Sequence, residues 1–110
     1  MDKNFNTPEK LHNFLQETDA VLVYFYSDNC TPCIQLRPKV SDLIENDFPE
    51  MKLLLINAEE YRDIAATYMA FSYPVLILFF EGKEFSRFSK HVSVAELKST
   101  IGRVYGIYFG

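Results

Sequence analysis

Three short apolar runs constrain the fold of this 110-residue chain more than any other feature. They are AVLVYFY at 20–26, KLLLIN at 52–57 and VLILFF at 75–80. Their residues are mostly β-branched, aliphatic or aromatic, and they show little alternation of polar and apolar positions. This pattern is typical of strands that are buried on both faces, as at the centre of a parallel sheet. We therefore expect all three runs to be buried strands.

Segments with helical spacing of apolar residues separate these strands. Helices are predicted at residues 8–17, about 32–47 and 60 or 61–69, and from the capping box that opens at Ser93. The second helix contains Pro38, which removes a backbone donor and should kink it. A turn at 81–83 and an alternating run at 84–88 predict a hairpin. Strands that alternate with helices and end in a hairpin indicate an α/β domain with a mixed sheet.

Nothing in the sequence marks a second domain. The length is close to the commonest domain size, and there is no internal repeat, low-complexity tract or Pro/Gly/Ser-rich linker. Residues 1–110 are therefore expected to form one domain. The hydrophobic fraction of 48% and the charged fraction of 24% are those of an ordinary globular protein.

Charge and hydropathy exclude several classes of partner. The formal net charge of -4 leaves no basic surface to recommend nucleic acid or anionic lipid as a partner. The longest apolar run, Val75–Phe80, is far too short to span a bilayer. The start, MDKNFNTPEK, has no apolar stretch of the kind found in signal peptides. We therefore expect a cytoplasmic protein, in a compartment that keeps exposed thiols largely reduced.

The chain has two cysteines, Cys30 and Cys33, in the stretch SDNCTPCIQL. Structural zinc sites need four nitrogen or sulfur ligands, and neither His12 nor His91 has a partner at a ligand spacing, so no metal is expected. A purely structural disulfide gains little from closing so short a loop. Two roles for the pair therefore remain: the cysteines are inert buried thiols, or they carry out thiol–disulfide exchange.

The position of the pair favours exchange. Cys30 follows a buried strand and precedes a helix, and unpaired N–H groups and the helix dipole stabilise a thiolate there. The thiolate is the nucleophile in disulfide exchange. Cys33, about one turn further on, should face inward and attack a mixed disulfide on Cys30. Pro32 lacks an N–H, which matters little in a first helical turn, and stiffens the loop.

The chain resembles the thioredoxin family over nearly its whole length. The residues that carry the resemblance are the strand VLVYFY, the CTPC motif of the C-x-P-C type, Pro38 five residues after the second cysteine, Tyr73-Pro74 ahead of VLILFF, the EGK turn and a final amphipathic helix. The resemblance implies a thioredoxin fold, an α/β architecture with a mixed central sheet of four to five strands flanked by helices.

The resemblance also implies a function and a site. It implies a thiol–disulfide oxidoreductase that exchanges disulfides with protein substrates through Cys30 and Cys33, in the reducing direction, without a cofactor and with a thioredoxin reductase as recycling partner. Pro74 takes the role of the family's cis-proline, and Tyr73 before it offers backbone hydrogen bonds to an extended substrate. The residues expected to contact substrate are Thr31, Pro32, Tyr73 and Pro74.

Several positions depart from the family pattern. Asn29 replaces a frequent tryptophan, and the turn before the last helix, SKHVS, lacks the usual glycine. Tyr24 aligns with a buried carboxylate thought to receive the proton of the second cysteine, and Leu55 aligns with its lysine neighbour. A phenol is a poor base at neutral pH, and losing both charges together avoids leaving either one buried alone. Asp28 is close in sequence but is expected to be exposed.

A second function class stays open from the sequence. In this alternative the chain is a non-catalytic binding module with the same fold, and it holds a partner through the Tyr73-Pro74 face or through the aromatic tail Tyr105–Gly110. The two intact cysteines favour the oxidoreductase. The tail could equally be the end of a packed last helix.

Overall fold

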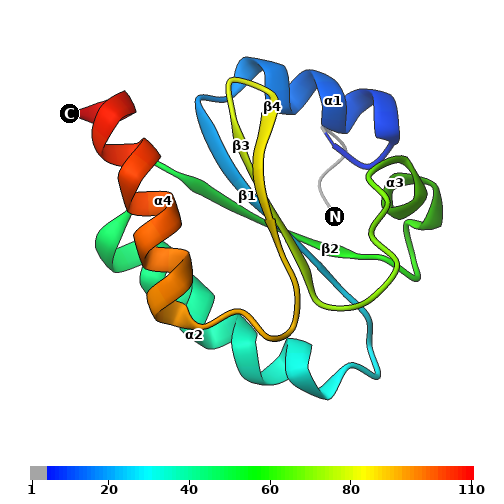
Figure 1. Ribbon diagram of the computed structural model, residues 1–110. Coiled ribbons are helices and arrows are strands. Elements are labelled where there is room, and N and C mark those ends of the chain that lie inside the picture. The colour runs from blue at the N-terminus through cyan, green and yellow to red at the C-terminus, as the bar shows by residue number, and fades with distance from the viewer. Residues whose placement is uncertain (1–4) are drawn as a thin grey trace.

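In the computed structural model, which describes residues 5–110, a four-stranded sheet lies between two pairs of helices (Figure 1). The elements are, in chain order, α1 (Pro8–Glu17), β1 (Ala20–Tyr26), α2 (Thr31–Asp47), β2 (Lys52–Asn57), α3 (Arg62–Thr67), β3 (Val75–Phe80), β4 (Lys83–Phe88) and α4 (Val94–Phe109). Residues 1–4 lie outside the described part. They belong to the N-terminal segment on which the expectation of no signal peptide was based.

The sheet has the strand order β2-β1-β3-β4 and is mixed. β1 pairs with β2 in parallel and with β3 in the antiparallel sense, and β3 and β4 form the hairpin. β1 is therefore a central strand, with Tyr24 opposite Leu55 on one side and Leu76 on the other. The predicted mixed sheet is confirmed, with four strands in the described residues.

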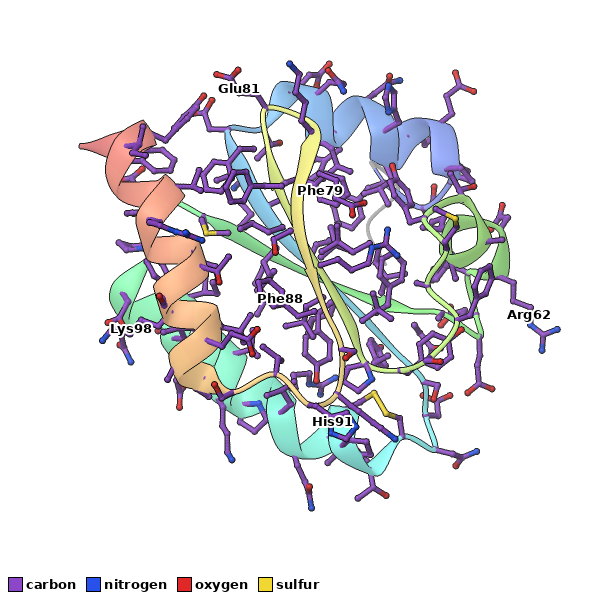
Figure 2. The ribbon with its side chains drawn as sticks, in the orientation of Figure 1. Arg62, Phe79, Glu81, Phe88, His91 and Lys98 are labelled. Carbon is purple, nitrogen blue, oxygen red and sulfur yellow. A yellow bond between two sulfur atoms is a disulfide. The ribbon has the colours of Figure 1, made fainter. Side chains whose placement is uncertain are left out.

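Each face of the sheet packs against one pair of helices. The face that includes Leu22 and Tyr24 packs with α2 and α4, and the face that includes Val23 packs with α1 and α3. Phe88 and Phe79, both labelled in Figure 2, belong to the first and the second of these core layers respectively. β1 and β3 contribute to both layers, which confirms that these two strands are buried on both faces.

The prediction that β2 is also buried was wrong. Only Leu54 and Ile56 of this strand are buried, while Leu55 is 36% exposed. The reason is topological, because β2 pairs with β1 alone and forms an edge of the sheet. On the α2 side Leu53 is only partly buried and Leu55 is exposed, whereas Leu54 and Ile56 on the other side are buried. All four are aliphatic, so the sequence does not show this alternation.

The N-cap predicted at Ser93 is confirmed, and Thr7 caps α1 in the same way. The side chains of Thr7 and Ser93 accept hydrogen bonds from backbone N–H groups three residues later, as N-caps do. The α2 helix contains Pro38 and continues past it to Asp47. α3 is shorter than predicted at both ends. Before it, the side chain of Asn57 accepts hydrogen bonds from the backbone N–H groups of residues 59 and 60 and holds them in a turn. After it, Met69 has a positive φ of 53°, which does not belong to a right-handed helix.

Candidate active site

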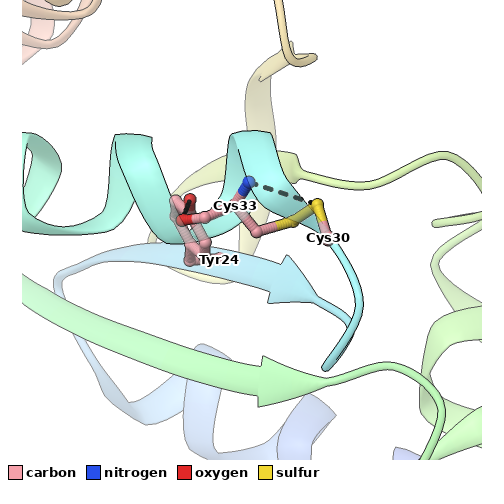
Figure 3. Close-up of a disulfide and its surroundings, with 3 residues drawn as sticks. All are labelled: Tyr24, Cys30 and Cys33. Carbon is pink, nitrogen blue, oxygen red and sulfur yellow. Dashed lines mark hydrogen bonds between the residues drawn. A yellow bond between two sulfur atoms is a disulfide. The ribbon is translucent and has the colours of Figure 1, made fainter.

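Cys30 and Cys33 form a disulfide at the junction of β1 and α2 (Figure 3). Cys30 is the N-cap of α2, and Thr31 and Pro32 occupy the first turn, where the missing N–H of proline is tolerated. The exposed fraction is 8% for Cys30 and 2% for Cys33. The second cysteine therefore faces inward, as predicted from the helical spacing.

The sulfur of Cys30 acts as the capping acceptor of α2. The backbone N–H of Cys33 donates a hydrogen bond to the Cys30 Sγ at 3.2 Å. The next N–H, of Ile34, donates to the Cys30 carbonyl at 3.2 Å. A thiolate on Cys30 in the reduced protein would be stabilised by the Cys33 N–H and by the positive end of the helix dipole.

Tyr24 contacts the second cysteine through its hydroxyl. This side chain is fully buried on β1, and its hydroxyl donates a hydrogen bond to the carbonyl oxygen of Cys33 at 2.7 Å (Figure 3). Burial raises the pKa of Tyr24 to about 12, against a smaller lowering by the positive charge of Arg37. At neutral pH the phenol is therefore a hydrogen-bond donor and not a base.

The peptide bond between Tyr73 and Pro74 is cis, as the resemblance implied. Pro74 is buried directly before β3, and Tyr73 is partly exposed. The antiparallel register pairs Val75 with Phe25, so the start of β3 and the end of β1 lie at the same end of the sheet. The fold therefore brings the cis-proline segment and the cysteine segment to one end of the molecule.

The loop that leads to Pro74 is tied to β4 by an arginine. Arg87 donates a hydrogen bond from Nη1 to the carbonyl of Met69 at 3.1 Å and pairs with Glu84 at 2.9 Å. Met69 has a positive φ of 53°, and its side chain and that of Phe71 are largely exposed. Sequence reasoning missed this link, because Arg87 and Met69 are far apart in the chain.

A groove of about 460 Å³ opens beside Cys33, between α2 and β2. It is lined by Tyr26, Ser27, Asp28, Cys33, Ile34, Arg37, Pro38, Ser41 and Leu55. The guanidinium of Arg37 lies over the Tyr26 ring, 5.6 Å from its centroid. Asp28 is exposed, as predicted, and accepts a hydrogen bond from the Asn57 side chain at 3.1 Å.

The exposure of Leu55 corrects one explanation drawn from the sequence. A lysine at this position would reach solvent at the groove, so it would not be a charge buried alone. Mutual burial therefore does not explain why both members of the family's charged pair are replaced. Only a charge at position 24 would be buried alone, since the Tyr24 side chain has no solvent exposure.

Residues 5–110 contain neither a metal-binding cluster nor a membrane-spanning helix. No three His, Cys, Asp or Glu side chains there lie close enough together to bind a metal ion. In the same residues, every helix is too short or too polar to cross a bilayer.

The sequence matches the family model described as Thioredoxin over residues 2–103. The chain belongs to the thioredoxin family. It is 32% identical over 100 residues to the thioredoxin-like protein YdfQ of Bacillus subtilis, covering 91% of this chain and 88% of that protein. It is also 39% identical over 67 residues to a thioredoxin of Chlamydia pneumoniae, covering 61% and 65% of the two chains.

Solved structures agree with this assignment. The X-ray structure of Fasciola hepatica thioredoxin superposes with a TM-score of 0.78 at 27% identity, covering 90% of this chain and 95% of that one. The fold is therefore the thioredoxin fold, as the resemblance implied. A thioredoxin-family chain with a Cys30–Cys33 disulfide is a thiol–disulfide oxidoreductase.

Proposed function

We propose that this thioredoxin-family protein reduces disulfides of protein substrates, with Cys30 as the attacking thiolate and Cys33 as the resolving thiol. The observation that carries the proposal is the place of Cys30 at the N-cap of α2, where its sulfur accepts the N–H of Cys33. Of the two cysteines, Cys30 is also the more exposed.

Reduction of the substrate takes two thiol–disulfide exchange steps. The Cys30 thiolate attacks one sulfur of the substrate disulfide, and the other substrate sulfur leaves as a thiolate and takes up a proton. Cys33 loses its proton and attacks the Cys30 Sγ, so the Cys30–Cys33 bond forms and the bond to substrate breaks. The substrate gains two electrons and becomes a dithiol, and the protein leaves as the disulfide.

The proposed docking face consists of Thr31, Pro32, Tyr73 and Pro74. Thr31 is exposed and Pro32 and Tyr73 are partly exposed, so these side chains are available to a substrate. Pro74 is buried, so its part is to shape the backbone before β3. A dithiol donor of the thioredoxin reductase class would return the protein to its reduced form, in the cytoplasm.

A non-catalytic binding module is the second candidate, and the exposed Met69 and Phe71 beside the Tyr73-Pro74 segment favour it. The aromatic tail supports it less than the sequence suggested. Residues 105–109 are the last turns of α4, and the Tyr105 ring packs 5.0 Å from that of Phe48 and 4.6 Å from that of Phe109.

Insulin, a protein with accessible disulfides, separates the two candidates. With dithiothreitol as reductant, the wild type should accelerate insulin reduction and Cys30→Ser should not. Cys33→Ser should accumulate a mixed disulfide between Cys30 and the substrate, because the resolving thiol is missing. Equal rates for wild type and Cys30→Ser would favour the binding module. Trapping by Cys30→Ser but not by Cys33→Ser would reverse the two roles.

The direction of exchange depends on the reduction potential of the Cys30–Cys33 couple, measured by equilibration with glutathione. A potential near that of thioredoxin, about -270 mV, supports reduction of substrates. A potential near about -120 mV, that of a strong oxidant, contradicts the proposed direction.

A further inference from the structure

The peptide group that joins Cys33 to Ile34 is hydrogen-bonded at both ends. Its carbonyl accepts the Tyr24 hydroxyl at 2.7 Å, and its N–H donates to the Cys30 carbonyl at 3.2 Å. The preceding N–H, of Cys33 itself, donates to the Cys30 Sγ. The backbone on both sides of the Cys33 Cα is therefore held in place relative to Cys30.

Tyr24 is a rigid point of attachment for this segment. It lies on the central strand, between Leu55 of β2 and Leu76 of β3, and its side chain has no solvent exposure. A short hydroxyl–carbonyl bond away from water is electrostatically stronger than one at the surface. The bond also polarises the amide, which strengthens the hydrogen bond that the Ile34 N–H makes to Cys30.

We infer that Tyr24 is a positioning residue for the resolving step: by binding the Cys33 carbonyl, it holds the Cys33 thiol within reach of the Cys30 sulfur. This inference rests on the proposed reducing cycle. Positioning lowers the barrier to attack because the freedom of the attacking group is lost before the reaction and not during it. In the step itself, the Cys33 thiolate bonds to Cys30 Sγ, and the electron pair of the broken bond stays on the leaving sulfur.

A positioning role differs from a base role in its pH dependence. The Tyr24 proton is donated to the carbonyl, and the raised pKa keeps it in place at neutral pH. Removing the hydroxyl should therefore lower the resolving rate by the same factor at every pH from mildly acidic to mildly alkaline. A group that accepted the Cys33 proton would instead change the shape of the profile when removed.

The probe is 5,5′-dithiobis(2-nitrobenzoate), added to the reduced protein. Cys30 attacks it and releases one thionitrobenzoate, and Cys33 then attacks the mixed disulfide and releases a second. The first release measures the nucleophile and the second measures the resolving step. The variant is Tyr24→Phe. The matched control is Tyr105→Phe, which removes a tyrosine hydroxyl that accepts the Glu50 N–H at 3.1 Å, on α4 and outside the site.

Loss of one buried hydrogen bond should slow the second release by about fivefold in Tyr24→Phe, with the first release unchanged. Tyr105→Phe should alter neither release. The inference is overturned by an unchanged second release, by equal slowing of both releases, or by a shifted pH midpoint. Tyr24→Phe keeps the ring that fills this buried site, so the packing of β1 against α2 is retained. A wild-type circular dichroism spectrum of the reduced variant checks this before either release is compared.

The proposed function and the positioning role of Tyr24 are tested by different measurements. A wild type that releases both equivalents of thionitrobenzoate but does not reduce insulin contradicts the proposed substrate class. The Tyr24 comparison uses only the probe and still decides the positioning role in that case.

Discussion

Leu55 of β2 lies directly opposite Tyr24 of β1 in the parallel register, but solvent reaches only one of the two side chains. Tyr24 is completely buried under α2, whereas Leu55 is 36% exposed at the groove beside Cys33. Many family members carry a carboxylate and a lysine at these two positions. The positions are thus neighbours with different surroundings, and a charge placed on each should have a different effect on the free energy of unfolding.

We expect Leu55→Lys to change the free energy of unfolding by less than about 1 kcal/mol, because the ammonium can reach water. Tyr24→Asp should destabilise by about 3 kcal/mol or more, because it buries a carboxyl group and leaves the site of the ring unfilled. Urea denaturation of both variants measures this difference. Equal destabilisation would contradict the assigned environments.

The reduced protein should react with iodoacetamide at Cys30 before Cys33. Cys30 is the more exposed of the two and lies at the helix N-terminus, where a thiolate is stabilised. We expect a rate ratio of at least about tenfold, measured by peptide mass spectrometry after short labelling times. Comparable labelling of both cysteines would show that the helix end does not activate Cys30.

Titration of the Tyr24 hydroxyl should make the free energy of unfolding fall at alkaline pH. Its pKa is 10 in the unfolded chain and about 12 in the folded protein, so folding favours the protonated form. Below pH 10 both states hold the proton and the stabilisation is complete. As pH rises from 10 to 12 only the unfolded state releases it, and up to about 2–3 kcal/mol of stability is lost.

Tyr24→Phe isolates this contribution from those of the other tyrosines. The variant should be the less stable protein at neutral pH, and the difference from wild type should shrink and then reverse as pH rises through this window. Urea midpoints at several pH values provide the measurement. Parallel curves would mean that Tyr24 titrates alike in the folded and unfolded states.

Two glycines should respond oppositely to alanine. Gly106 lies inside α4 and a Cβ there would meet nothing within 4 Å, so Gly106→Ala should stabilise by about 0.5–1 kcal/mol through helix propensity. Gly82 has φ +80°, and its Cβ would clash with the Gln16 side chain and approach the Gln16 Cα to 3.0 Å. Gly82→Ala should destabilise by more than about 1 kcal/mol. Thermal denaturation tests both, and a shift of the same sign in both variants would contradict the argument.

Local sequence signals were sufficient for much of this fold. β1, β2 and β3 have the predicted bounds because each apolar run ends in polar or turn-forming residues. The strand-to-helix junction around Cys30 and Cys33 was predictable for the same reason. The cis bond before Pro74 was predictable only through the family resemblance, since most prolines in folded proteins are trans.

Contacts between distant segments were not predictable from local pattern. The Tyr24 hydroxyl reaches the Cys33 carbonyl because of the distance between β1 and α2, which no spacing in the sequence encodes. The same holds for the Arg87 hydrogen bond to Met69. The exposure of Leu55 follows from the strand order, and an apolar residue at an edge position looks like a core residue until that order is known.

The two outer strands of the sheet differ in their protection against pairing with another polypeptide. β4 carries Lys83, Glu84 and Arg87 within six residues, and charges of this kind discourage edge-to-edge association. β2 has a single charge, Lys52, at its first position, followed by four aliphatic residues. At high concentration or on partial unfolding, association between copies should therefore begin along β2.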